Sequence, residues 1–582
     1  MWSNITKRII FIGRFKSIKG FSSRNLSLSL CRYDIISNGI LKNSQTVEIP
    51  RLSIPEFVFS RSEQFSDLVE YECPITKRSY TYGQVRKRSK NISKMLRKKL
   101  GLDRRDTVLV LLQNIPEFPI AVMGCLEADL IVSTANCMYT PEEIARQLRD
   151  SQAKLIITSY ELYSTAQKAS EKLGRKLPII CIKTLQDQSL PRDTIDFEEI
   201  STTVLDVPDV EPPNPDDVAI LPYSSGTTGL AKGVRLSHYN IVSNLLQVYT
   251  VANDLIGTAS GNYQETTPTV LPFFHIYGFT ITTLLMMLKG VRALTLPRFQ
   301  PDTYIQTFKD YKINFVYVAP PLILFLTMHP EVKSEYLRHL TFAISGAAPL
   351  GSLDEQRFIE KAGQNVLMIQ AYGLTETSPV VASNTRTIRT KFLEESKGSI
   401  GHVLPNTEVK IVKPGDTTDT PLGPMESGEL LVKGPQVMQG YHNNPKATEE
   451  IFSNGWLRTG DLAHYNEHGF LYITDRVKEL IKVKGFQVPP AELEELLRDH
   501  PSIADAAVIG IPDPVSGEVP RAYIKLKEPV EPEDIDRFIN DKVAKYKRLD
   551  GGIEFVKEIP KNAAGKILRR ELKQRYLQEQ NA

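Results

Sequence analysis

Residues 221–233 read Leu-Pro-Tyr-Ser-Ser-Gly-Thr-Thr-Gly-Leu-Ala-Lys-Gly, and this stretch decides how the rest of the chain is interpreted. Glycines allow backbone N–H groups to turn toward an anion, and the neighbouring hydroxyls add hydrogen-bond donors. The lysine adds a positive charge, so the combination suits the phosphates of a nucleotide. The residues expected to bind them are Ser224, Ser225, Gly226, Thr227, Thr228, Gly229 and Lys232.

The glycine spacing differs from that of the Walker A motif, and Gly233 follows the lysine where that motif has Ser or Thr. A flexible linker is the plain alternative for a stretch rich in Ser, Gly and Thr. A linker, however, needs neither the apolar strand expected at residues 218–221 nor the lysine after the glycines. We therefore interpret the stretch as a phosphate-binding loop.

Short apolar runs alternate with helical segments between residues 107 and 370. The run at 107–112 is continuous, as expected of a strand that is buried on both faces. This alternation predicts an α/β architecture with largely parallel sheets. A helix is expected at 116–126, and further strands at 155–158, 314–318, 340–345 and 366–370.

Residues 270–288 contain no Asp, Glu, Lys or Arg. A membrane-spanning helix prefers about 20 evenly apolar residues, whereas this run includes a proline, a histidine and several threonines. We therefore predict a strand at 270–274 followed by a buried helix, and no transmembrane segment.

The pattern changes near residue 400. Short strands separated by Gly, Pro and Asn turns predict a small antiparallel barrel or sheet, with strands at 408–412, 428–432 and 470–473. A second change follows residues 476–478, where we place a domain boundary. The last part then reads as a compact α+β unit with a helix at 491–499, strands at 504–511 and 522–527, and a helix at 533–543.

Composition excludes several classes of protein. The 71 basic and 68 acidic residues leave a net charge of +3, which gives no argument for a nucleic-acid partner. A hydrophobic fraction of 41% is that of a globular chain and not of a disordered one. The five cysteines have neither metal-binding spacing nor the even count of a disulfide framework, so we expect no zinc site and a reducing compartment.

No acidic residue precedes Asp34, whereas Lys, Arg and Ser are frequent there. On a helical wheel Trp2, Ile5, Ile9 and Ile12 share one face. Such a basic, amphipathic start is typical of a mitochondrial presequence, which we place at residues 1–45 with the matrix as destination. A disordered basic tail on a cytoplasmic or peroxisomal protein is the alternative.

The string Ser-Ser-Gly-Thr-Thr-Gly-Leu-Ala-Lys-Gly resembles the signature of the adenylate-forming family, which contains acyl-CoA synthetases, 4-coumarate:CoA ligases, beetle luciferases and peptide-synthetase adenylation domains. Further segments follow in family order across residues 50–575. Ala371 and Ala564 depart from the pattern, because many relatives have Gly and Thr there. The matching segments are 271–278 (LPFFHIYG), 345–350 (SGAAPL), 370–377 (QAYGLTET), 456–461 (WLRTGD), 475–488 (DRVKELIKVKGFQV) and 560–566 (PKNAAGK).

The resemblance implies a fold of the α/β class. A large N-terminal AMP-binding domain, residues 46–476, would contain two α/β subdomains and a small β-barrel-like subdomain. A small mobile α+β domain, residues 477–582, would follow it and would rotate about Lys478.

The resemblance also implies roles for individual residues. The nucleotide site would comprise the phosphate loop with Gln370, Ala371, Tyr372, Thr375, Asp461, Arg476, Gln487 and Lys566. The acid pocket would comprise His275, Ile276, Tyr277, Gly346, Ala347, Gly373, Pro379 and Val380. CoA would be bound by Arg298, Lys484 and Gly485. The catalytic residues would be Lys566, Lys482, Glu376 and Thr375, with Glu376 as a Mg²⁺ ligand because hard cations prefer oxygen ligands.

The implied reaction is the ATP-dependent ligation of a small carboxylic acid to CoA through an acyl-AMP intermediate, with Mg²⁺ as cofactor. The acid is left open between a fatty acid and a 4-coumarate-like aromatic acid, although the Phe-His-Ile-Tyr string favours the latter. Three other classes are weighed against this one. They are a luciferase-like monooxygenase, a stand-alone adenylation enzyme that loads a carrier protein, and a non-catalytic ATP-binding protein.

Overall fold

The computed structural model describes residues 35–224, 231–477, 479–484, 486–540, 542–562 and 565–580. Several predictions fall outside these residues. They concern the segment 1–34, Ser225, Gly226, Thr227, Thr228, Gly229, Lys478 and Gly485, together with the side chain of Gln487. The fold and the site are therefore described from the base of the phosphate loop and from the segments around it.

A seven-stranded sheet forms the first α/β part, in the order β13-β10-β6-β5-β7-β8-β9. Its pairs are parallel from β10 to β9, and β13 joins β10 antiparallel. β5 is buried at every residue, as its continuous apolar sequence predicts. The strands are β5 Thr107–Leu111, β6 Ile131–Thr134, β7 Leu155–Ser159, β8 Ile179–Ile182, β9 Thr194–Asp196, β10 Val218–Ile220 and β13 Leu236–Ser237.

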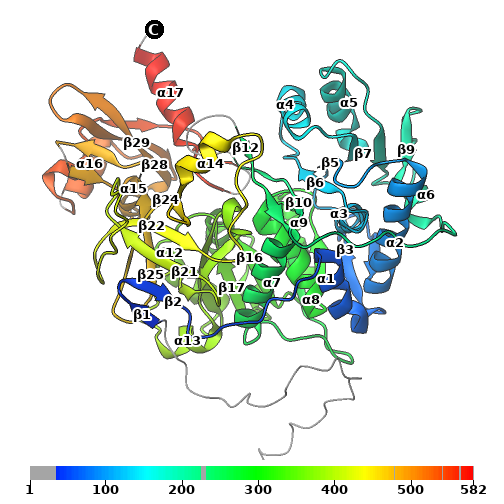
Figure 1. Cartoon of the computed structure of the whole chain (residues 1–582). Helices are drawn as coiled ribbons and strands as arrows, with labels where there is room; N and C mark the ends of the chain where they lie inside the picture. The colour runs from blue at the N-terminus through cyan, green and yellow to red at the C-terminus, as the bar shows by residue number, and fades with distance from the viewer. Residues whose placement is uncertain are drawn as a thin grey trace, which may run out of the picture. The chain divides into compact units, whose positions relative to one another are not determined.

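Helices cover both faces of this sheet (Figure 1). Leu109 of β5 packs with Leu148 of α4 and Ala169 of α5 in one hydrophobic cluster. Val108 points the opposite way, because side chains alternate along a strand, and packs in a larger cluster with Phe118 of α3. The helices are α1 Ile54–Ser62, α2 Tyr82–Lys94, α3 Glu117–Glu127, α4 Pro141–Ser151, α5 Tyr163–Glu171, α6 Phe197–Thr202 and α7 His238–Ala252.

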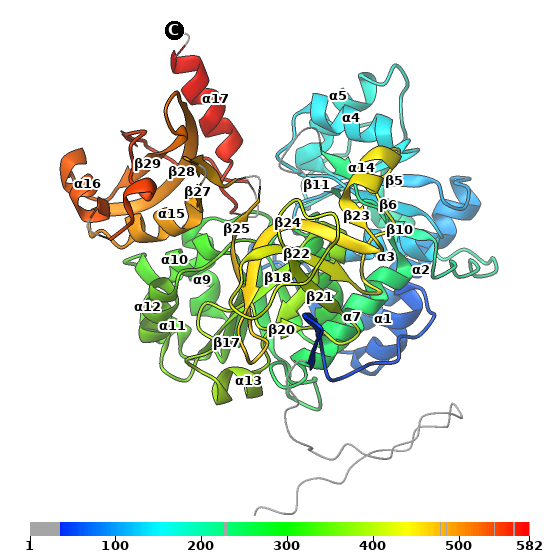
Figure 2. The same cartoon turned by 60° about the vertical axis from the view of Figure 1, so that its left-hand side comes forward.

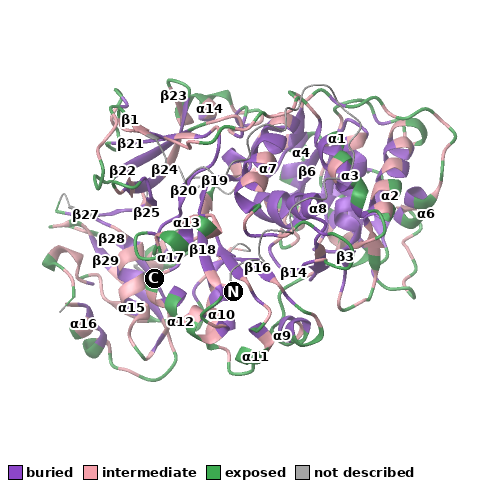
Figure 3. Ribbon diagram, turned by 90° about the horizontal axis from the view of Figure 1, so that it is seen from below, coloured by how far each residue is buried: buried purple, intermediate pink, exposed green. Residues whose placement is uncertain are grey.

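Two smaller sheets carry the second α/β part, in the orders β14-β15-β3-β4 and β16-β17-β18-β19-β20. Figure 3 shows β16 and β18 among the buried residues, with exposed residues on α12 and α13. The strands are β3 Val69–Glu72, β4 Ser79–Thr81, β14 Thr266–Thr269, β15 Arg292–Thr295, β16 Phe315–Val318, β17 Phe342–Ser345, β18 Leu367–Gly373, β19 Val380–Ser383 and β20 His402–Val403. The helices are α8 Met286–Lys289, α9 Pro301–Asp310, α10 Pro320–Met328, α11 Ser334–Leu337, α12 Ser352–Ala362 and α13 Arg386–Lys391.

The predicted strand at residues 270–274 is wrong. β14 ends at Thr269, and turns lead from it to a π-helical segment, Gly278–Leu285, that continues into α8. The amide of Asn114 takes the place of a sheet neighbour: it donates to the carbonyl of Thr269 at 3.0 Å and accepts from the N–H of Phe273 at 2.8 Å. The buried helix after the turns is confirmed, and no helix within the described ranges is long and apolar enough to cross a membrane.

A seven-stranded antiparallel sheet follows, in the order β1-β2-β21-β22-β24-β23, with β25 beside β24. β21 has the predicted bounds, 408–412. The predicted start of the folded domain at residue 46 is too late, because the hairpin of β1 and β2 pairs with β21 and places the fully buried Leu41 opposite Val409. The strands are β1 Ile35–Ser37, β2 Ile40–Lys42, β21 Glu408–Val412, β22 Gly428–Lys433, β23 Phe452–Ser453, β24 Trp456–Tyr465 and β25 Leu471–Arg476, and the one helix placed among them is α14 Pro445–Ile451.

The C-terminal α+β unit, orange to red in Figure 2, has the strand order β27-β26-β29-β28 with β30 beside β29. Its sheet packs on both faces, with Val508 in one hydrophobic cluster and Ile509 in another. β29 begins earlier than predicted, because β28 and β29 form one long hairpin that pairs Asp513 with Gly517. The elements are β26 Ile481–Val483, β27 Phe486–Val488, α15 Pro490–Arg498, β28 Ile503–Asp513, β29 Gly517–Leu526, α16 Pro532–Asn540, β30 Ile553–Phe555 and α17 Arg569–Gln580.

Candidate active site

The base of the phosphate loop is a small hairpin of β11, Tyr223–Ser224, and β12, Lys232–Gly233. Ser224 lies opposite Lys232 in its register, so two predicted phosphate ligands meet there. The hydroxyl of Tyr223 donates to Oδ2 of Asp150, at the end of α4, at 2.6 Å. The hairpin is therefore anchored on the first α/β part.

Glu376 lies in a 3-10 turn, Thr375–Thr377, directly beyond β18. Its side chain reaches the hairpin, because Oε1 accepts hydrogen bonds from the hydroxyls of Ser224 at 3.2 Å and Tyr441 at 2.9 Å. The structure thus brings the predicted phosphate ligands at the base of the loop together with the predicted metal ligand, although they are far apart in sequence.

The surroundings of Glu376 fit a magnesium ion that is held jointly by the protein and by ATP. Mg²⁺ usually takes one or two carboxylates and completes its shell with phosphates and water. In the described part of the chain, no group of three or more His, Cys, Asp or Glu side chains could hold a metal alone. Both hydrogen bonds to the Glu376 carboxylate use Oε1, which leaves Oε2 for a cation.

The predicted ribose and adenine residues form a second group. The hydroxyl of Tyr372 donates to Oδ2 of Asp461 at 2.6 Å, and Nε of Arg476 lies 3.2 Å from Oδ1. Burial raises the pKa of Asp461, while Arg476 and Tyr372 act in the opposite direction. The amide of Gln370 bonds in both directions with the backbone of Leu350, at 3.2 and 3.1 Å, and so holds the turn after β17 against β18.

Lys566 lies in the loop before α17, where its N–H donates to Oδ1 of Asn562 at 2.9 Å. Its Nζ lies 4.0 Å from Oε1 of Glu479. Burial, and then repulsion by Arg476, lower the pKa of Lys566 to about 8, while Glu479 and Asp461 raise it. The predicted adenylation lysine therefore shares one electrostatic environment with the predicted ribose residues.

Three segments predicted to line the acid pocket meet. Tyr277 packs against Gly346 so closely that a Cβ on the glycine would lie 3.1 Å from the tyrosine ring. A Cβ on Gly373 would lie 2.1 Å from the carbonyl oxygen of Pro379, a contact only glycine allows. The hydroxyl of Thr280, one turn after Tyr277, donates to the carbonyl of Ser378 at 3.0 Å. This bond links the Tyr277–Gly346 contact to the Gly373–Pro379 contact. The remaining predicted lining residues, His275, Ile276, Ala347 and Val380, belong to these same segments.

The pocket residues include an unsatisfied polar group. Tyr277 is 8% exposed, and its hydroxyl has no hydrogen-bond partner among the described residues. Nδ1 of His275 accepts from the N–H of Tyr277 at 3.2 Å, and burial lowers the pKa of this histidine to about 4. Ala347 adopts φ 72°, a left-handed conformation that is strained for a residue with a Cβ.

The residues predicted for the CoA side lie apart from this group. Arg298, Lys482 and Lys484 are exposed. Within the described ranges, none of their hydrogen bonds or ion pairs involves Lys566 or the phosphate residues. The backbone N–H of Lys482 instead donates to Oε2 of Glu518 at 2.9 Å. The structure therefore places Lys482 and Lys566 in different surroundings on the C-terminal unit.

The sequence interpretation missed residues that hold the site in place. Tyr441 bonds to Glu376, Asp150 anchors Tyr223, and Glu479 faces Lys566. Each of these contacts joins segments that lie far apart in the chain. In the sequence, Tyr441 is an aromatic residue within a polar, glycine-containing turn. That pattern predicts that its ring is buried, but it does not predict which residue its hydroxyl contacts.

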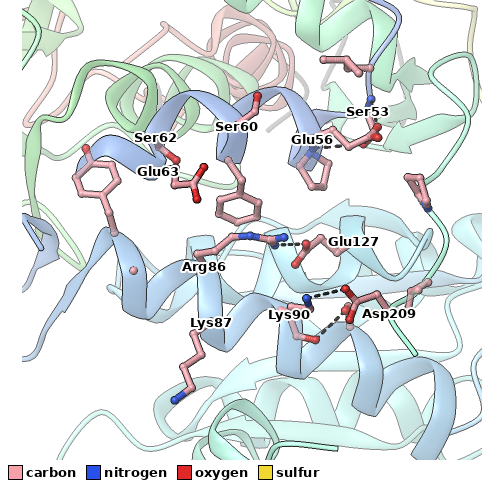
Figure 4. A pocket seen from close by; sticks show the side chains of 18 of the residues that line it. Ser53, Glu56, Ser60, Ser62, Glu63, Arg86, Lys87, Lys90, Glu127 and Asp209 are labelled. Atoms are coloured by element: carbon pink, nitrogen blue, oxygen red, sulfur yellow. Dashed lines mark hydrogen bonds and ion pairs between the residues drawn. The ribbon is translucent and has the colours of Figure 1, made fainter. Parts of the chain in front are cut away.

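A cavity of about 980 Å³ lies elsewhere, beside α1 and α2 (Figure 4). Its charged side chains are largely paired with one another: Arg86 contacts Glu127, and Lys90 lies 2.6 Å from Asp209. None of the predicted site residues lines it. We therefore do not count this cavity as part of the candidate active site.

Known proteins with similar sequences belong to the family that the arrangement of the site residues indicates. The sequence profile of the AMP-binding enzyme family matches residues 59–442, and that of the AMP-binding enzyme C-terminal domain matches residues 492–566. A probable 4-coumarate--CoA ligase of Dictyostelium discoideum is 36% identical over 545 residues, which cover 90% of this chain and 95% of that protein. A 4-coumarate--CoA ligase of Oryza sativa subsp. japonica is 37% identical over 543 residues, covering 90% and 93%.

A solved structure is similar over almost the whole chain. The o-succinylbenzoate CoA synthetase of Bacillus subtilis, in complex with its acyl-adenylate intermediate, superimposes with a TM-score of 0.73 at 27% identity. The match covers 90% of this chain and 99% of that one. The chain described here therefore belongs to the family of AMP-binding enzymes, and it is an adenylate-forming acid–thiol ligase.

Proposed function

We propose that this ligase joins a hydroxylated aromatic acid of the 4-coumarate type to CoA, with ATP and Mg²⁺. The observation that carries the choice of acid is the buried hydroxyl of Tyr277, which has no hydrogen-bond partner among the residues that the structure describes. A buried polar group without a partner is costly, and a phenolic hydroxyl of the substrate would satisfy it. The names of the relatives, 4-coumarate--CoA ligases, favour the same class of acid.

In the first half-reaction, a carboxylate oxygen of the acid forms a bond to the α-phosphorus of ATP, and the bond from that phosphorus to the bridging oxygen of pyrophosphate breaks. Ser224 and Lys232 would hold the leaving phosphates, and Lys566 would stabilise charge on the α-phosphate. A magnesium ion at Glu376 would neutralise part of the phosphate charge when bound. Tyr372 and Asp461 would hold the adenine and the ribose.

In the second half-reaction, the CoA thiolate forms a bond to the acyl carbon and the bond to AMP breaks. Lys566 and Lys482 have different surroundings on the C-terminal unit, which supports two separate faces for the two steps. We propose a rotation about Lys478 that exchanges these faces. A domain closure of this kind also excludes water from the acyl-AMP.

Replacing Lys478 with proline restricts the backbone at the proposed hinge. We expect adenylation to be spared and thioester formation to slow, as measured by pyrophosphate release and by acyl-CoA formation from supplied acyl-AMP. An unchanged rate of acyl-CoA formation would contradict the hinge.

The test of the substrate is a screen of pyrophosphate release over hydroxylated aromatic acids, unhydroxylated aromatic acids and fatty acids, with and without CoA. We expect hydroxycinnamic acids to react fastest, and Tyr277→Phe to lose about tenfold in kcat/KM for them but little for unhydroxylated cinnamic acid. A preference for medium- or long-chain fatty acids would instead favour a role in fatty acid metabolism. Formation of ADP, or of no nucleotide product, would contradict the reaction itself.

We also propose a mitochondrial location, supported by the basic and acid-free composition of the first residues. A fluorescent protein fused to residues 1–45 should colocalise with mitochondria. A diffuse signal would contradict this proposal without affecting the proposed reaction.

A further inference from the structure

Residues 438–442, here named the bridging segment, connect the Glu376 turn to the phosphate loop. The first N–H of the segment donates to the carbonyl of Glu376 at 2.8 Å. Its backbone then bonds in both directions with Arg235, at 3.0 Å each, and its last N–H donates to the carbonyl of Gly233 at 2.7 Å. The segment is therefore fixed against both predicted phosphate-binding elements by its main chain.

Among the contacts of the described residues, Tyr441 is the side chain of this segment that reaches the charged groups of both elements. Its hydroxyl donates to Oε1 of Glu376 at 2.9 Å, and its ring centre lies 4.9 Å from Nζ of Lys232. The residue is 8% exposed and packs in the large hydrophobic cluster, so its ring has a defined position. Gly440 allows this approach, because a Cβ there would lie 2.7 Å from the side chain of Thr448.

The hydroxyl of Tyr441 is the donor in its hydrogen bond to Glu376, because an ionised carboxylate can only accept. The donated proton points at one oxygen of the carboxylate and fixes the rotation of that group. Partners that orient a metal-binding side chain typically change metal affinity by 10- to 100-fold when they are removed.

We propose that Tyr441 is a positioning residue of the adenylation site: its hydroxyl turns the Glu376 carboxylate so that Oε2 faces the metal bound to ATP, while its ring holds the ammonium group of Lys232 beside the same phosphates. This inference rests on the proposed role of Glu376 as a Mg²⁺ ligand. Tyr441 would then set the distance between two groups of the site. One is the Glu376 carboxylate, which would hold the metal, and the other is the ammonium group of Lys232, which would bind the phosphates.

The test is calorimetric binding of ATP, in the absence of any acid, to wild type and to Tyr441→Phe. Each protein is titrated once with Mg²⁺ present and once in EDTA. Phenylalanine keeps the ring beside Lys232 but removes the hydroxyl. We expect the dissociation constant of Mg·ATP to rise about tenfold, whereas that of metal-free ATP stays within about twofold.

Tyr441→Leu should weaken both titrations, because it also removes the cation–π contact with Lys232. The matched control is Tyr465→Phe, which removes a buried tyrosine hydroxyl that donates to a backbone carbonyl, Leu422, at 3.1 Å. We expect that control to bind both forms of ATP as wild type does. An equal loss for both forms in Tyr441→Phe, or no loss, would overturn the proposal.

Glu376→Gln separates this proposal from the one on which it rests. If Glu376→Gln leaves Mg·ATP binding unchanged, the metal role of Glu376 fails. If it weakens Mg·ATP binding while Tyr441→Phe does not, only the role of Tyr441 fails. When both hold, adding Tyr441→Phe to Glu376→Gln should cost little more than Glu376→Gln alone, as a double-mutant cycle requires of coupled residues. Unfolding midpoints near that of wild type confirm that each variant is folded.

Discussion

Glu376 and Lys566 act on the same nucleotide in the proposed reaction, yet their surroundings differ. Glu376 is held by two neutral hydroxyls and by a backbone bond. The backbone of Lys566 exchanges two hydrogen bonds with Asn562, but its side chain lies among charges, namely Glu479, Arg476 and Asp461. The contacts of Glu376 fix the orientation of its carboxylate. The charges around Lys566 instead determine whether its ammonium group keeps its proton. Adenylation should therefore depend on pH mainly through the C-terminal unit.

The largest expected effect is that of removing the Lys566 ammonium. Loss of one group that stabilises developing charge typically costs a hundredfold or more. Lys566→Ala should lose that much of the adenylation rate, measured by pyrophosphate release, and should still convert supplied acyl-AMP to acyl-CoA. Lys561→Ala is the control, because its Nζ contacts Asp505 at 2.5 Å and not the site. An equal loss of both half-reactions would contradict the assignment.

The next effect is a dependence of adenylation on alkaline pH. The pKa of Lys566 is about 8, so the free enzyme loses the needed positive charge as pH rises through that value. We expect kcat/KM for ATP to fall about tenfold between pH 7 and pH 9. Lys566→Arg keeps its charge and should remove this decline, although its rate is lower throughout. A decline that persists in Lys566→Arg would assign the titration to another group.

A smaller effect is expected at the base of the phosphate loop. Tyr223→Phe removes the hydrogen bond to Asp150 and leaves the hairpin otherwise intact. We expect the KM for ATP to rise about fivefold with little change in kcat, since the bond positions the loop but takes no part in the reaction. Tyr263→Phe is the matched control, because it removes a similar bond, to Glu265 at 2.8 Å, elsewhere. A change in kcat alone would show that the bond acts on the chemistry.

The smallest effect tests whether neutral contacts also matter for Lys566. Asn562→Ala removes the side chain that accepts the Lys566 N–H. This bond is only partly buried, so it lies at the low end of the range of about 0.5–1.5 kcal/mol for a neutral hydrogen bond, and we expect a loss of about threefold in adenylation and none in thioester formation. A loss as large as that of Lys566→Ala would show that adenylation depends on the position of the lysine side chain more than on its charge.

Much of the fold and of the site could be predicted from sequence where one local pattern carries the information. The apolar run of β5, and the turn residues that delimit β21, predicted strands close to those observed. The strand predicted at 270–274 fails because Asn114, far away in the chain, bonds the backbone there. Tyr441 could not be assigned for the same kind of reason: its role depends on contacts with Glu376 and Lys232 that only the fold brings together.

The pairing of β2 with β21 has a practical consequence for how this protein is produced or matured. If cleavage or truncation removed residues through 45, β21 would become an open edge with unpaired N–H and C=O groups, a template for association with other chains. A cut before Ile35 would keep that hairpin in place. Recombinant versions that begin at residue 35 should therefore stay dispersed at concentrations where versions that begin at residue 46 precipitate.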